Sequence, residues 1–163
     1  MVLQRASDTH PNQDFTPSDF GQVSSYCGTS NGDLLAPTSY VCRYLGQSSA
    51  FEEAWSPYGN DSGLCVGAGA GPGAGAKLTL QPCGESARTL LIVDISHLVT
   101  RNGEFYVPLI SGTASTFSQP LAVTVDEGSK KPANQLVLQR EKLQSGGRVE
   151  DSQLFAFANG PVS

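Results

Sequence analysis

The four cysteines are the residues of this chain whose types and spacing most clearly predict chemistry. Cys27 and Cys42 lie 15 residues apart, and Cys65 and Cys83 lie 18 apart. An even number of cysteines in similar pairs, with no C-x-x-C, favours oxidised bridges in an exported protein over a zinc site. The repeated spacing therefore indicates two copies of one disulfide-stapled unit.

The two histidines, His10 and His97, lie too far apart in sequence to form a spaced ligand motif with these cysteines. We therefore expect no metal site and no cofactor. Asp94 and His97 could be combined with a serine into a hydrolytic triad, but no G-x-S-x-G motif accompanies them. We interpret His97 as a surface-loop histidine and expect a protein that is not an enzyme.

A glycine-rich segment, residues 67–76, contains the G-x-G-x-x-A pattern of a dinucleotide-binding loop. Pro72 lies inside the pattern, and the following residues 77–80 alternate like a strand. Without a helix there is no N-terminal dipole to receive a pyrophosphate. We interpret the segment as a hairpin connection.

The composition is that of one turn-rich β domain. The chain has 163 residues, of which 39% are hydrophobic and 15% charged, with 18 glycines and 10 prolines. Its net charge of −5 gives no support for capture of a phosphate backbone, so we expect no nucleic-acid partner. No apolar run is long enough to span a membrane. Residues 1–16 are too polar for a signal peptide, so the expected export leader would be absent from this chain.

Short apolar runs alternate with clusters of Gly, Pro, Asn and Ser from residue 26 onward, which predicts strands. The expected strands centre on residues 40–42, 64–66, 77–80, 90–93, 105–110, 121–125, 136–138 and 154–157. Period-two alternation in 77–81 and 121–125 predicts one buried and one exposed face in each strand. Asn102-Gly103 predicts a hairpin turn. Residues 1–22 are polar and lack periodicity, which predicts a flexible arm before a domain at 23–163.

The second cysteine unit has an S-G-L-C-V-G strand, a glycine-rich connection and a K-L-T-L-Q-P-C strand, followed eight residues later by Leu91. In this order it resembles a subdomain of the ricin-type β-trefoil lectin family, in which a Q-x-W motif closes each unit. Gln153-Leu154-Phe155 is similar to a further Q-x-W copy with Phe in place of Trp, and Phe51 holds that place in the first unit.

The resemblance implies an all-β fold, a β-trefoil of three repeats at about 26–58, 59–104 and 105–159. Phe51, Leu91 and Phe155 would then share one core layer. Because each cysteine pair brackets one unit, we expect the bridges Cys27 to Cys42 and Cys65 to Cys83, the sequential one of three connectivities.

The family's sugar pocket implies an Asp two residues after the first Cys of a unit and an aromatic residue two before the second. The Asp places hold Thr29 and Gly67, and the aromatic places hold Tyr40 and Gln81. Only the first unit keeps its aromatic platform, with Asp33 as a displaced acceptor. Tyr40 would equally fit a half-buried strand tyrosine.

A second candidate surface surrounds Trp55, the only tryptophan, and Tyr58 in a Pro-Tyr-Gly turn. Exposed, the two rings would form a stacking surface with Glu52 and Glu53 as hydroxyl acceptors. The alternative is a Trp55 in the core.

The sequence therefore predicts a secreted, monomeric, non-catalytic module that binds a glycan or cell-wall polysaccharide through Asp33, Tyr40, Trp55 and Tyr58. Two alternatives remain: a protease inhibitor of the Kunitz soybean type, which is similar in size and bridges, and a trefoil interaction protein that has lost sugar binding.

Overall fold

The computed structural model describes the backbone of the strands Val2–Leu3, Phe15–Gln22 and Ala50–Pro57, together with residues 63–68, 73–82, 89, 91–112, 115, 119–126 and 134–156. These residues form strands and two short 3₁₀ helices, so the described part is all-β, as predicted. The strands are β1 (Val2–Leu3), β2 (Phe15–Gln22), β3 (Ala50–Pro57), β4 (Leu64–Ala68), β5 (Leu78–Pro82), β6 (Leu91–Asp94), β7 (Val99–Arg101), β8 (Glu104–Val107), β9 (Leu109–Ser111), β10 (Leu121–Asp126), β11 (Asn134–Arg140) and β12 (Phe155–Ala156); the helices are η5 (Ile95–His97) and η6 (Asp151–Gln153).

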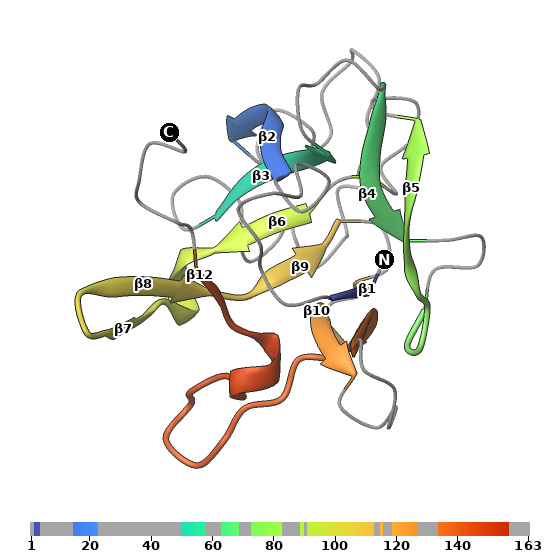
Figure 1. Ribbon diagram of the computed structural model, residues 1–163. Helices are drawn as coiled ribbons and strands as arrows, with labels where there is room; N and C mark the ends of the chain where they lie inside the picture. Colours follow the sequence, from blue (N-terminus) through green and yellow to red (C-terminus); the bar gives the residue numbers. More distant parts are fainter. Residues whose placement is uncertain are drawn as a thin grey trace.

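One antiparallel sheet organises the molecule, in the order β1-β11-β10-β9-β6-β3-β2. From β2 to β10 its strands follow one another down the view in Figure 1. Two hairpins leave this sheet: β4–β5 connects β3 to β6, and β7–β8 connects β6 to β9. β12 returns from the C-terminal side to pair with β8.

The hydrophobic core uses alternate residues of the central strands, as period-two geometry requires. Leu91 and Val93 of β6, Leu121 and Val123 of β10, and Leu138 of β11 belong to one buried cluster. The residues between them are also buried, so β6 and β10 are covered on both faces. The predicted wet face of 121–125 was therefore wrong, because the chain around η6 covers the second face of β10.

Gln153 holds this covering segment in place. Its side chain is fully buried; its Oε1 accepts from the Lys142 backbone N–H at 2.8 Å. Its Nε2 donates to Thr124 Oγ1 and to the Arg140 carbonyl, both at 2.9 Å. One amide thus connects β10, the end of β11 and η6 with its polar groups satisfied.

The predicted turn at Asn102-Gly103 is confirmed, between β7 and β8. Both residues have positive φ, 52° and 85°, which the two-residue turns that match strand twist require. The interpretation of residues 67–76 as a hairpin connection agrees with the pairing of β4 with β5. In β5, however, Leu78 is buried while Leu80 is 44% exposed, so the alternation of 77–81 does not mark a buried face along its whole length.

The described strands do not form the predicted trefoil of three similar units. The expected boundary between residues 104 and 105 cuts through β8, which pairs with β7 of the preceding unit. The expected second unit contributes only β6 to the main sheet, whereas the third contributes the consecutive strands β9, β10 and β11. The Asn102-Gly103 turn, which pairs β7 with β8, therefore predicted the local fold better than the repeated cysteine spacing did.

Strands β1 and β2 lie within residues 1–22, the range for which the sequence predicted an N-terminal arm. β2 pairs with β3 at the edge of the sheet, and its register shifts between Pro17 and Asp19. An edge strand with a bulge tolerates proline, which cannot donate a ladder hydrogen bond. Pairing with β3 supplies the order that the polar sequence does not signal.

Two other predictions fall partly outside the described residues. Cys65 is fully buried and disulfide-bonded, but its partner lies outside them, so the bridge to Cys83 and the pairing of Cys27 with Cys42 stay predictions. Leu91 belongs to the core cluster and Phe155 packs against it, whereas the side chain of Phe51 is outside the described part.

Candidate functional site

The side chains that the sequence singled out for sugar binding lie outside the described part of the structure. Asp33, Tyr40 and Tyr58 lie outside the described residues. The backbone of Trp55 lies in β3 opposite Pro17, and its side chain is not described. Their role in binding stays a prediction.

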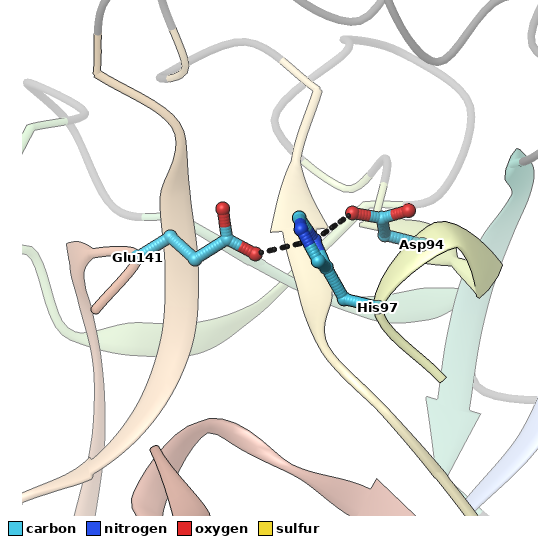
Figure 2. Close-up of side chains that lie close together, drawn as sticks. All are labelled: Asp94, His97 and Glu141. Atoms are coloured by element: carbon cyan, nitrogen blue, oxygen red, sulfur yellow. Dashed lines mark hydrogen bonds and ion pairs between the residues drawn. The ribbon is translucent and has the colours of Figure 1, made fainter. Parts of the chain in front are cut away.

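A different set of side chains meets at one end of the main sheet. Figure 2 shows His97 between the carboxylates of Asp94 and Glu141. His97 Nδ1 lies 2.8 Å from Asp94 Oδ2 and 3.1 Å from Glu141 Oε1. The Asp94 side chain is fully buried, that of Glu141 is 4% exposed and that of His97 is 26% exposed. The imidazole therefore forms the solvent-facing side of a buried acidic site.

Local structure positions the first two residues. Asp94 ends β6 and caps η5, with Oδ1 accepting from the Ser96 backbone N–H at 2.9 Å and from the Ser96 hydroxyl. His97 ends the same 3₁₀ turn, and because such a turn has about three residues, positions i and i+3 eclipse each other. The D-I-S-H sequence thus sets Nδ1 against Oδ2.

Glu141 follows a different strand of the main sheet, β11, which is separated from β6 by β10 and β9. It directly follows β11, and its backbone N–H donates to the Pro120 carbonyl at 2.9 Å. The chain of pairings β6-β9-β10-β11 brings this residue close to η5. No local motif announces it in the sequence, which is why sequence reasoning missed it.

The acidic surroundings favour a positive charge on His97. Hydrogen bonding to Asp94, with Glu141 acting in the same direction, raises the pKa of His97 from 6.5 to about 10, against the opposing effect of burial. The Nδ1 atom of His97 carries one hydrogen, which it shares with Asp94. Glu141 Oε1 forms an ion pair with the same Nδ1 but has no hydrogen-bond partner among the described residues. The interpretation of His97 as a surface-loop histidine was therefore wrong.

The geometry does not support acid-base catalysis by a serine triad. The Ser96 hydroxyl donates to Asp94 and not to the imidazole, so it is not activated by His97. An imidazole whose pKa lies near 10 is protonated at neutral pH and is a poor general base. What the three side chains offer is a set of ligand atoms within 4.8 Å of one another, able to hold a cation.

A second candidate surface lies on the β7–β8 hairpin, which extends away from the sheet in Figure 1. Phe105 is 51% exposed and Leu98 is 42% exposed. Phe105 lies opposite Thr100, and Leu98 precedes that residue by two positions, so the three share one face of the hairpin. This face presents an aromatic ring to solvent.

The opposite face of the hairpin is polar. The Tyr106 hydroxyl donates to Glu104 at 2.6 Å, which raises the pKa of the phenol. The Arg101 guanidinium lies 5.5 Å from the centre of the Tyr106 ring and also pairs with Asp151. The hairpin thus has an apolar face with the Phe105 ring and an opposite face with charged donors and acceptors.

Comparison with known proteins adds no identification. A scan against models of protein families, a search of curated proteins and a search of solved structures each found no match. Among the described residues, no helix is long and apolar enough to span a membrane.

Proposed function

We propose that this chain is a secreted, non-catalytic module that binds carbohydrate. The observation that carries the proposal is the exposed Phe105 ring on the β7–β8 hairpin, which shares its face with Thr100, while the next pair toward the turn, Arg101 and Glu104, lies on the other face. Sugar recognition needs a flat apolar surface for the C–H face of the pyranose and polar groups for its hydroxyls. This hairpin tip offers both.

Two further features support an extracellular location and a neutral glycan ligand. Cys65 is disulfide-bonded, and such bonds persist mainly in oxidising, extracytoplasmic compartments. The net charge of −5 disfavours anionic polymers as ligands and leaves neutral glycans as a fitting class. The inhibitor alternative rested on a trefoil shape that the described strands do not form, so we do not pursue it.

The test is a glycan array probed with the full chain, followed by titration of the best ligand. Phe105→Ala should weaken binding at least about tenfold, because it removes the stacking surface. Leu80→Ala is the matched control, since it removes an exposed apolar side chain from the other hairpin. Unchanged affinity in Phe105→Ala would move the site to Tyr40 and Asp33. The absence of any array ligand would favour a protein partner for the hairpin.

A further inference from the structure

We propose that Asp94, His97 and Glu141 form a binding site for a divalent transition-metal cation, ligated by Oδ2, Nδ1 and Oε1. They are the only group of three or more His, Cys, Asp or Glu residues with converging ligand atoms among the described residues. The proposal is independent of carbohydrate binding.

The strongest observation is the state of Glu141. Its side chain is 4% exposed, yet Oε1 points at the imidazole and has no hydrogen-bond partner in the described part of the structure. A buried acceptor left without a partner costs free energy, and more so when it is charged. An ion between Glu141 and its two neighbours would satisfy this oxygen.

Charge balance leads to the same conclusion. Asp94 and Glu141 form no other ion pair in the described structure, so one imidazolium faces two buried carboxylates. Two carboxylates thus lie against a single imidazole in a poorly solvated place, where unbalanced negative charge is costly. A divalent cation among the three side chains would balance both carboxylates.

The two distances from the imidazole suit a metal, and the whole set of ligand atoms lies within 4.8 Å. The Nδ1 atom of His97 lies 2.8 Å from one carboxylate oxygen and 3.1 Å from the other. Neighbouring ligands in octahedral geometry are about 3.0 Å apart when the bonds are about 2.1 Å. One imidazole with two carboxylates suits Zn²⁺ or Mn²⁺ better than Ca²⁺, which prefers oxygen alone.

The surroundings of the site support its ligands. The Ser96 backbone N–H and hydroxyl hold Asp94 Oδ1, which orients Oδ2 toward the site. Such outer hydrogen bonds position ligands in metal sites. His97 is partly exposed and gives the ion a route of entry.

Zn²⁺ is the probe for the test. Chelator-treated protein is titrated with zinc chloride by calorimetry at pH 7.5, in two buffers of different ionisation enthalpy. We expect one ion to bind per chain and one proton to be released, because the Nδ1 that donates to Asp94 must lose its proton to become a ligand. In the wild-type protein, imidazole NMR should show zinc shifting His97 before His10.

Variants distinguish this site from surface binding. His97→Gln and Glu141→Gln should each lower zinc affinity at least about tenfold. Glu150→Gln and His10→Gln are the matched controls and should leave it unchanged. No saturable binding up to about 1 mM zinc would overturn the proposal, as would binding that His97→Gln leaves intact. The wild-type NMR experiment decides the case even if a variant fails to fold, and none of these readouts depends on a glycan.

Discussion

Gln153 and Glu141 are two buried polar side chains near the same end of β11, and they differ in the number of hydrogen bonds that their polar atoms make. Gln153 makes three hydrogen bonds, to Lys142, Thr124 and Arg140. Glu141 Oε1 makes none among the described residues, although it faces the imidazolium of His97. The polar atoms of Gln153 are therefore satisfied by the fold, whereas one carboxylate oxygen of Glu141 lacks a hydrogen bond.

This difference distinguishes a buried polar side chain that stabilises the fold from one that is a candidate for ligand binding. A buried polar group that serves the fold is expected to be satisfied, because an unmet group costs about 1–3 kcal/mol. Glu141 departs from that rule next to a second buried carboxylate, Asp94. We interpret this departure as part of the proposed cation site, and the following predictions test that distinction.

Replacing Gln153 should have the largest effect on stability. Gln153→Ala leaves the Lys142 N–H, the Arg140 carbonyl and the Thr124 hydroxyl without their buried partner, so we expect a loss of about 3 kcal/mol. Urea unfolding measures this loss, with Gln144→Ala as the control because the Gln144 side chain is exposed. A loss below about 1 kcal/mol would mean that Gln153 does not organise this end of the sheet.

Sequence patterns predicted the local features of this fold and not its long-range ones. Short apolar runs bounded by turn residues predicted the described strands from β4 onward, and Asn102-Gly103 predicted the turn, because each depends on neighbours in the chain. The cysteine spacing suggested repeats, but strand pairing across residues 104 and 105 shows that spacing alone does not define a unit.

The candidate sites show the same limit. Asp94 and His97 were visible as a pair in sequence, whereas Glu141 reaches them only through the pairing of four strands. Its significance lies in its burial, which a lone glutamate after a strand does not signal. Phe105 was visible as part of a strand, but its exposure follows from the hairpin leaving the sheet.

The charge on His97 predicts a smaller, pH-dependent effect. Its pKa in the folded protein is about 10 against 6.5 unfolded, so its stabilisation is fully present below about pH 6.5 and is lost as the pH rises through 10. In metal-free protein we expect on the order of 1–2 kcal/mol to disappear across this range, since the ring is partly exposed to solvent. Unfolding curves with EDTA measure it, and subtraction of the His97→Gln curve removes contributions from other groups. Identical pH profiles for the two proteins would show that Asp94 and Glu141 do not stabilise the imidazolium.

Glu141→Gln should have the smallest effect, and it tests the comparison most directly. The substitution keeps the shape of the side chain and removes a buried charge whose Oε1 has no hydrogen-bond partner among the described residues. The lost attraction to His97 is offset by the lower cost of burying a neutral amide, so we expect a change below about 1 kcal/mol in metal-free protein. The reciprocal Gln153→Glu, of similar shape, should cost about 3 kcal/mol, because it removes the two donors of the amide and buries a charge. Urea unfolding of both variants with EDTA gives the two changes in the free energy of unfolding.

Equal losses would place Glu141 in the same structural role as Gln153, whereas a small loss in Glu141→Gln leaves its buried carboxylate available for a cation.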